Sequence, residues 1–266
     1  MNDCAIGIFD SGIGGLALVD ELNKYLPDED IIFHYDPLEL TDTENDKNLI
    51  KEYINKNIQY FLNKNVKMIL SCSSEANTVS GLKTPDTQVK YSGVFLPAAQ
   101  AACGATKNNK IGILGSAQVV KKGGYVRVIK NIKPNAAVTG CICPMLSQII
   151  ETGLTAGDPA VRLALEQSLQ TLIADKTDTV ILADGHYTAV RTLAAEILGP
   201  SVAVISPFEE TAKQAYNYLL SSDLLTFRET TGLNRIDLET DHENFSGIAS
   251  MFIERENTVF SDCRQK

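Results

Sequence analysis

The sequence lacks any long run of hydrophobic residues. No apolar stretch approaches the roughly 20 residues that a membrane helix needs. The N-terminus also lacks the basic segment and short apolar run of a secretory signal. We therefore expect a cytoplasmic protein with no membrane partner. The 266 residues, 44% of them hydrophobic and 21% charged, allow one large globular domain or two of moderate size.

Basic residues are too few to balance the acidic ones. The chain has 24 Lys and Arg residues against 33 Asp and Glu, which gives a formal net charge of −9. A nucleic-acid-binding protein requires a basic face, so this balance argues against a nucleic-acid partner. An anionic small molecule is still compatible, because one site can be locally cationic or rich in backbone N–H groups.

Ligand sets for metals and cofactors are also missing. The six cysteines lack the paired spacing of a zinc site or a disulfide framework, and the three histidines complete no ligand set. The glycine-rich segment "DSGIGG" at 10–15 is not the G-x-G-x-x-G fingerprint of nicotinamide cofactors, and no ribose-binding acidic residue follows at the right distance. We expect no metal and no cofactor.

What the sequence does contain is an alternation of strand and helix signals. Apolar runs at 5–10, 30–35 and 66–72 are typical of buried strands. Helical stripes of apolar residues occupy 15–26 and 49–62 between them. Strands that alternate with helices predict an α/β fold with parallel sheets.

Three short apolar segments recur in the same order further along the chain. They are "IGIFDS" at 6–11 with "IGILGS" at 111–116, "MILSCS" at 68–73 with "VILADG" at 180–185, and "GVFLP" at 93–97 with "AVISP" at 203–207. This internal repeat, called the sequence echo below, predicts two similar α/β domains related by a pseudo-two-fold axis, with an active site in the cleft between them.

Cys72 and Asp184 occupy matching positions at the ends of two predicted strands, where open α/β sheets bind ligands. Two proton-handling groups could then approach one substrate from opposite sides, as inversion at carbon requires.

These residues resemble a known family. "IGIFDSGIGGL", "ILSCSSEA", "GVFLPAAQAA" and the "HY" at 186–187 are similar to the glutamate racemase branch of the aspartate/glutamate racemase superfamily. The resemblance implies a first domain from residues 1–94 plus 208–266 and a second from 95–207. It also implies a cofactor-independent racemase that converts L-glutamate to D-glutamate for peptidoglycan synthesis, with a small acidic substrate and an expected homodimer.

The resemblance also assigns the catalytic residues. In this family one cysteine removes the α-proton and another delivers a proton to the opposite face. The first cysteine falls on Cys72, the aspartate that assists it falls on Asp10, and a substrate-contacting serine falls on Ser11. The histidine that assists the second cysteine falls on His186. The second cysteine itself falls on Asp184, so a carboxylate stands where the family has a thiol.

Other substrate-contacting positions depart from the family pattern. Ser73 and Ser74 replace an asparagine and a threonine after the first cysteine, Gly185 replaces a threonine, and Thr41, Asp42 and Thr43 replace a proline-tyrosine-glycine segment. Asp42 would add negative charge near a carboxylate pocket.

The chemistry of the two main candidates leaves alternatives open. Backbone N–H groups and a helix N-terminus should shift Cys72 toward thiolate, although a buried strand-end cysteine without function fits the same pattern. Asp184 could act as a base with a raised pKa, orient His186 as the proton carrier, or only cap the helix that follows.

Three functions are therefore compatible with the sequence. The first is a racemase or epimerase of an acidic amino acid. The second is a single-thiol enzyme of the same superfamily, such as a decarboxylase of malonate-type diacids, which needs only one protonating group. The third is a homologue that binds a ligand without turnover.

Overall fold

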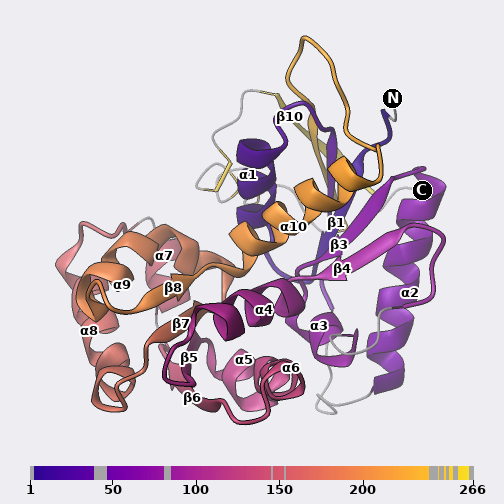
Figure 1. The fold of residues 1–266 in the computed structure, drawn as a ribbon. Coiled ribbons are helices and arrows are strands. Elements are labelled where there is room, and N and C mark those ends of the chain that lie inside the picture. The colour runs from indigo at the N-terminus through magenta and orange to yellow at the C-terminus, as the bar shows by residue number, and fades with distance from the viewer. Residues whose placement is uncertain are drawn as a thin grey trace. The chain divides into compact units, whose positions relative to one another are not determined.

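The computed structural model describes residues 3–38, 47–80, 85–144, 146–152, 154–239, 245, 249, 252–253 and 257–263. The chain divides into two compact units (Figure 1). The first unit combines Met1–Val94 with Thr211–Lys266, and the second is Phe95–Glu210. Each unit is built on its own parallel β-sheet with helices packed against it.

The first unit contains a six-stranded sheet in the order β10-β9-β2-β1-β3-β4, and every neighbouring pair is parallel. Its strands are β1 (Ile6–Asp10), β2 (Ile31–Tyr35), β3 (Met68–Ser71), β4 (Lys90–Gly93), β9 (Asn234–Leu238) and β10 (Thr258–Asp262). Strands β1, β2 and β3 form at the apolar runs that the sequence indicated. Because all strands run the same way, their carboxyl ends share one edge of the sheet.

Helices α1 (Leu16–Tyr25) and α2 (Lys47–Asn63) lie on opposite sides of this sheet (Figure 1). Their apolar stripes were predicted at 15–26 and 49–62. The stripe of α2 packs Ile54, Ile58 and Phe61 against Phe9 of β1. A Cβ atom at Gly7 would lie 2.5 Å from the Phe61 ring, so glycine permits this close approach of helix to strand. Two further helices are α3 (Ser74–Ser80) and α10 (Pro207–Ser221), the latter running from the second unit into the first.

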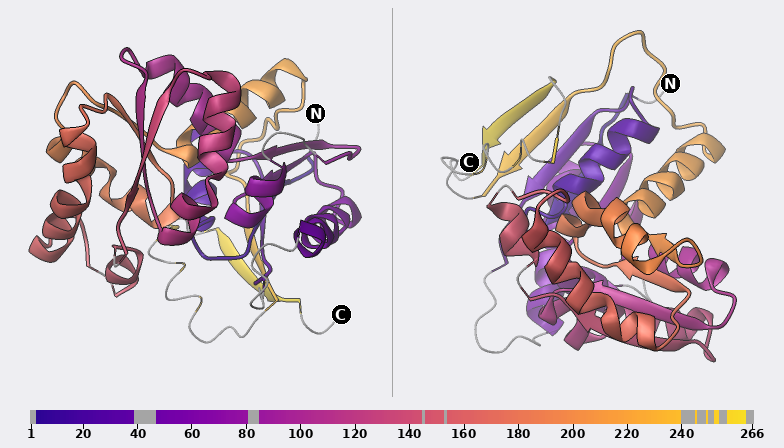
Figure 2. Two further views of the ribbon diagram at one scale, coloured as in Figure 1. Left: turned by 90° about the horizontal axis from the view of Figure 1, so that it is seen from below. Right: turned by 90° about the vertical axis from the view of Figure 1, so that its left-hand side faces the viewer.

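The second unit contains a four-stranded parallel sheet in the order β6-β5-β7-β8. Its elements are α4 (Phe95–Ala105), β5 (Lys110–Gly115), α5 (Ala117–Lys122), α6 (Gly124–Ile132), β6 (Ala137–Ile142), α7 (Leu146–Glu151), α8 (Pro159–Ala174), β7 (Thr179–Leu182), the 3₁₀ helix η1 (Gly185–Val190), α9 (Arg191–Leu198) and β8 (Ala203–Ile205). Helices α8 and α9 cover one face of the sheet, and α4 to α6 lie on the other (Figure 2).

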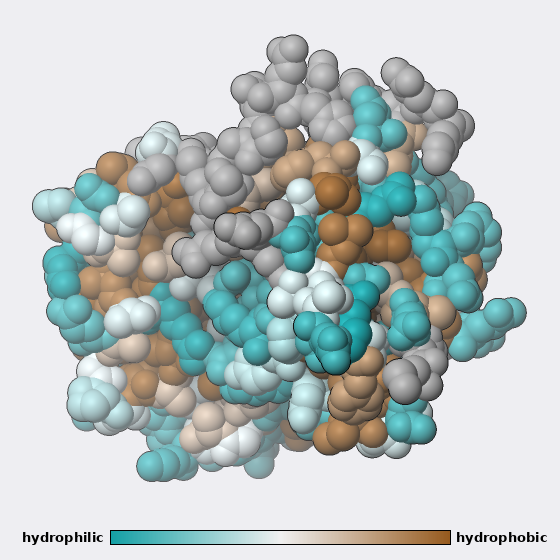
Figure 3. All heavy atoms as spheres, turned by 90° about the horizontal axis from the view of Figure 1, so that it is seen from above, coloured by the Kyte–Doolittle hydropathy of each residue, from teal (hydrophilic) through white to brown (hydrophobic). Residues whose placement is uncertain are grey.

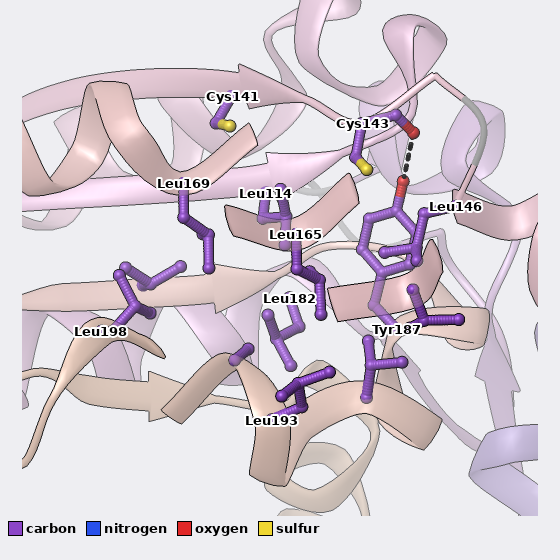
Figure 4. Packing of buried hydrophobic residues seen from close by; sticks show 14 of the residues in the cluster. Leu114, Cys141, Cys143, Leu146, Leu165, Leu169, Leu182, Tyr187, Leu193 and Leu198 are labelled. Carbon is purple, nitrogen blue, oxygen red and sulfur yellow. Dashed lines mark hydrogen bonds between the residues drawn. The ribbon is translucent and has the colours of Figure 1, made fainter. Parts of the chain in front are cut away.

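The core of the second unit is aliphatic. Leu114 of β5 and Leu182 of β7 pack against Leu165 and Leu169 of α8 and Leu193 of α9 (Figure 4). All five side chains are fully or almost fully buried. Such burial stabilises by roughly 1.5–3 kcal/mol per large side chain, before any loss of conformational entropy is counted. The rigid core holds the carboxyl end of β7, which carries part of the candidate site.

The two sheets repeat one topology. The order β2-β1-β3-β4 in the first unit matches β6-β5-β7-β8 in the second. Two pairs of repeated segments form matching strands, β1 with β5 and β3 with β7. The third pair matches less closely, because 203–207 contains β8 whereas 93–97 begins at the last residue of β4 and continues into α4. The prediction of two similar parallel-sheet α/β domains is confirmed.

The register of the strands differs from the sequence echo by one residue near the candidate site. The Cys72 N–H donates to the Phe9 carbonyl at 2.9 Å, and at the same point of the second sheet the Ala183 N–H donates to the Leu114 carbonyl at 2.8 Å. Ala183 is therefore the hydrogen-bonded equivalent of Cys72. Asp184 lies one residue further from its strand than the echo predicted.

No helix among the described residues is long and apolar enough to span a membrane. On the face drawn in Figure 3, hydrophobic and hydrophilic residues are interspersed.

Candidate active site

The first group of candidate residues lies at the carboxyl ends of β1 and β3. Asp10 is the last residue of β1, and Cys72 follows the last residue of β3. Phe9 and Ser71 are paired across the two strands, so the next residues, Asp10 and Cys72, lie beside each other. Both side chains are buried, with 7% and 8% of their surface exposed. The parallel sheet thus brings together the thiol and the carboxyl that the sequence singled out.

Asp10 is held by the glycine turn that follows it. Its Oδ2 atom accepts a hydrogen bond from the Gly15 N–H at 2.8 Å. Burial raises the pKa of Asp10 to about 7, while hydrogen bonds from the backbone of Gly15, Gly12 and Ser11 oppose that rise and the charge of Glu75 adds to it. A Cβ atom at Gly15 would lie 2.9 Å from Oδ2, so the turn requires glycine there. The N–H groups of this turn therefore bind an anion within the protein itself, the Asp10 carboxylate.

The raised pKa makes the protein less stable as pH rises toward neutrality. Between the ordinary pKa of 3.8 and about 7, the unfolded chain loses the Asp10 proton while the folded chain keeps it. This interval of about 3 pH units, at about 1.4 kcal/mol each, corresponds to about 4 kcal/mol. We expect Asp10→Asn to remove this loss, so that its free energy of unfolding rises relative to the wild type between about pH 4 and pH 7.

Urea denaturation at a series of pH values would measure this effect. Asp28→Asn removes a more exposed carboxyl of the same unit and serves as the control. Curves for Asp10→Asn and the wild type that stay parallel across the range would contradict the prediction.

Cys72 is a protonated thiol at neutral pH. Burial, and after it the nearby Asp10 carboxylate, raise its pKa well above the ordinary value. The expectation that the turn shifts this thiol toward thiolate is therefore wrong, because loss of hydration and a neighbouring negative charge both disfavour the anion. The helix that follows, α3, has only seven residues.

The backbone around Cys72 is held by one amide. The Asn77 Nδ2 atom donates to the carbonyls of Ser71 at 2.9 Å and Ser73 at 2.8 Å, on either side of Cys72. A Cβ atom at Gly93 would lie 1.9 Å from Asn77 Oδ1, so the end of β4 leaves room for this amide only because it is glycine. The backbone on both sides of Cys72 is therefore held in place, and this fixes the position of the thiol.

Two serines and a glutamate complete the first group. Ser11 Oγ lies 3.3 Å from Glu75 Oε2 and 3.4 Å from Ser73 Oγ, and Ser73 Oγ lies 3.2 Å from the same carboxylate oxygen. Ser11 is half-buried, Ser73 and Glu75 are buried, and Ser74 begins α3 in a half-buried position. Sequence reasoning missed Glu75. Its only signal was a carboxylate directly after two hydroxyl residues at a helix start.

The second group lies beyond β7 and consists of Asp184, Gly185 and His186. Asp184 Oδ1 accepts hydrogen bonds from the His186 backbone N–H at 3.2 Å and lies 2.8 Å from its Nδ1 atom. Asp184 thus caps η1 and contacts the His186 ring at once. The predicted helix after Asp184 begins as η1 and becomes α-helical only at Arg191, the first residue of α9.

A buried tyrosine anchors this turn to the core. Tyr187 is fully buried, and its hydroxyl donates to the Cys143 carbonyl at 3.1 Å (Figure 4). Because Tyr187 follows His186 directly, this bond restricts where the imidazole can lie. Gly185 is buried at the start of η1.

Three predicted substrate-contacting residues, Thr41, Asp42 and Thr43, lie outside the described residues. Within the described part of the chain, no group of three or more His, Cys, Asp or Glu side chains is arranged to hold a metal ion.

No family model matches the chain. Among curated proteins it is similar to the glutamate racemase of Oceanobacillus iheyensis, with 31% identity over 264 residues that cover 98% of this chain and 93% of that protein. It is also similar to the glutamate racemase of Streptococcus equi, with 30% identity over 261 residues, 95% of this chain and 96% of that protein. A solved glutamate racemase from Bacillus anthracis matches the whole of both chains at 23% identity with a TM-score of 0.83. One from Francisella tularensis, solved in complex with D-glutamate, matches 98% of both chains at 23% identity with a TM-score of 0.80. The likeness to the curated proteins is high enough and long enough to decide the relationship, and the chain belongs to the glutamate racemase family.

Proposed function

We propose that this protein interconverts L- and D-glutamate by moving the proton at Cα, without a cofactor, and supplies D-glutamate for peptidoglycan. The observation that carries the proposal is the buried Cys72 thiol beside the Asp10 carboxyl at the carboxyl ends of two parallel strands, in a chain of the glutamate racemase family. The malonate-type decarboxylase has no comparable support.

Cys72 and Asp10 serve one face of the substrate. As a protonated thiol, Cys72 can deliver a proton to a carbanion at Cα. To remove the α-proton instead, it must first lose its own proton. A neighbouring carboxyl with a pKa of about 7 titrates near neutral pH and is therefore suited to take up that proton and return it. We assign Cys72 as the proton carrier and Asp10 as its partner.

His186 and Asp184 serve the other face. A carboxylate acceptor at Nδ1 holds the imidazole proton on that atom in the neutral ring, which makes Nε2 the basic nitrogen. The 2.8 Å contact between Asp184 and Nδ1 supports this arrangement. In this proposal the imidazole replaces the missing second thiol as proton carrier, and Asp184 orients it.

The remaining assignments concern binding. We propose that residues from both groups contact the substrate, namely Ser11, Ser73, Ser74, Gly185, Thr41, Asp42 and Thr43. A homodimer and a cytoplasmic location stay predictions, and light scattering of the purified protein would measure the first.

Proton NMR of L- and D-glutamate in D₂O tests the function directly. We expect the Cα proton signal of either enantiomer to disappear in the presence of the protein and the opposite enantiomer to form. A folded protein that exchanges neither enantiomer would overturn the proposal. Release of CO₂ from a disubstituted malonate would then favour the single-thiol decarboxylase.

A further inference from the structure

Glu75 is a buried acidic residue to which the family resemblance assigns no role. Glu75 lies in the first turn of α3 and is only 5% exposed. Its Oε2 atom accepts hydrogen bonds from the hydroxyls of Ser11 and Ser73, which come from two different strand ends. The carboxylate therefore joins the turn after β1 to the start of α3, beside Cys72.

Ser11, Ser73 and Glu75 form a cluster in which both serine hydroxyls donate to other members of the cluster. Ser73 has one proton, which goes to Glu75, and its oxygen also accepts the N–H of Ala76 at 3.3 Å. Ser11 has one proton as well, and both of its acceptors, Glu75 Oε2 and Ser73 Oγ, belong to the cluster. A serine hydroxyl with its proton engaged offers a ligand only lone pairs. Ser11 is the half-buried member, so it is the one that a ligand can reach.

We propose that Glu75 is a positioning residue that makes the Ser11 hydroxyl a hydrogen-bond acceptor toward the substrate, so that the α-ammonium group, and not a carboxylate, binds at this end of β1. The assignment rests on the proposed function, since it takes an amino acid as the substrate. An ammonium group donates three hydrogen bonds and accepts none, so it matches a hydroxyl that presents lone pairs.

The acidic residues near Ser11 favour a cationic ligand. Burial raises the pKa of Asp10, at the end of the same strand, and the charge of Glu75 adds to that rise. The neighbouring Tyr53 hydroxyl also has a raised pKa, caused mainly by burial and then by Asp10, Asp36 and Glu75. A carboxylate placed beside Ser11 would meet this negative charge, whereas an ammonium group would be attracted by it.

Isothermal titration with glutamate and with glutarate tests the proposal, because glutarate has the same two carboxylates and no ammonium. We expect the wild type to bind glutamate more tightly than glutarate. In Glu75→Gln the ratio of glutamate affinity to glutarate affinity should decrease by a factor of about 10 to 100, mostly because glutamate binds more weakly. The KM for glutamate should rise more than kcat falls. Glu52→Gln, which removes an exposed carboxylate of α2, should keep the wild-type preference.

A second variant protects the test against misfolding of Glu75→Gln. Ser11→Ala removes the accepting oxygen but leaves Glu75 in place, and we expect the same loss of preference. The proposal is overturned if the wild type binds glutamate no better than glutarate, or if both variants keep the wild-type preference. A wild type that prefers glutamate in binding and yet exchanges no Cα proton would refute the racemase function alone.

Discussion

Replacing Cys72 by serine is expected to slow inversion of glutamate by about 10²–10⁴-fold, the usual loss when a general acid or base is removed. Serine keeps the size of the side chain, so the buried position next to Asp10 is retained. A serine hydroxyl is much less acidic than a thiol and cannot carry the proton at a useful rate. Formation of the opposite enantiomer, followed by polarimetry from L-glutamate and separately from D-glutamate, measures the loss.

The matched control for this variant is Cys103→Ser. Cys103 is also a buried thiol, 9% exposed, on α4 in the second unit. Its replacement carries the same chemical change at a comparable depth, so it should leave inversion unchanged. If Cys72→Ser inverts glutamate at the rate of Cys103→Ser, the thiol at position 72 is not the proton carrier. Thermal unfolding of both variants shows whether they are folded.

Secondary structure was predicted correctly where the pattern of apolar residues is regular. Strands β1 to β3 are short apolar runs followed by glycine or small polar residues, and α2 carries a regular apolar stripe, so their types were predicted correctly. Strands β9 and β10 were not predicted. The segment "NRIDL" of β9 has three polar residues among five and buries Asp237. That carboxylate is paired with Arg235 at 2.7 Å, a tertiary arrangement that single-sequence patterns do not report.

The candidate site was predicted unevenly for a similar reason. The family resemblance paired Asp10 with Cys72, and the structure has these residues side by side because the parallel strands β1 and β3 end at one edge. The direction of the Cys72 pKa was wrong, since the extent of burial depends on the packed structure. Glu75 was missed because an acidic residue in the first turn of a helix is common for electrostatic reasons alone. Only the distances to Ser11 and Ser73 show that it belongs to the site.

The second large effect is expected at the Asp184–His186 pair. Replacing His186 by glutamine removes the proposed proton carrier and should lower inversion by about 10²–10⁴-fold. Replacing Asp184 by asparagine should also lower it strongly, because the negative charge that fixes the Nδ1 proton is lost. Each variant keeps Cys72, so one enantiomer should still exchange its Cα proton without inversion. Cys72→Ser should show the same behaviour with the opposite enantiomer.

These variants separate the three roles that the sequence left open for Asp184. Asparagine caps a helix about as well as aspartate, so a purely capping role predicts full activity in Asp184→Asn. If Asp184 itself carries the proton, His186→Gln should keep much of the activity that Asp184→Asn loses. Comparable losses in both variants indicate an imidazole carrier oriented by the carboxylate 2.8 Å away. Asp158→Asn makes the same chemical change at the N-cap position of α8 in the same unit, where the carboxylate accepts from Thr155 rather than from the helix, and it should leave inversion intact. Its retention of activity would show that an Asp→Asn change at a helix start of this unit does not by itself slow inversion.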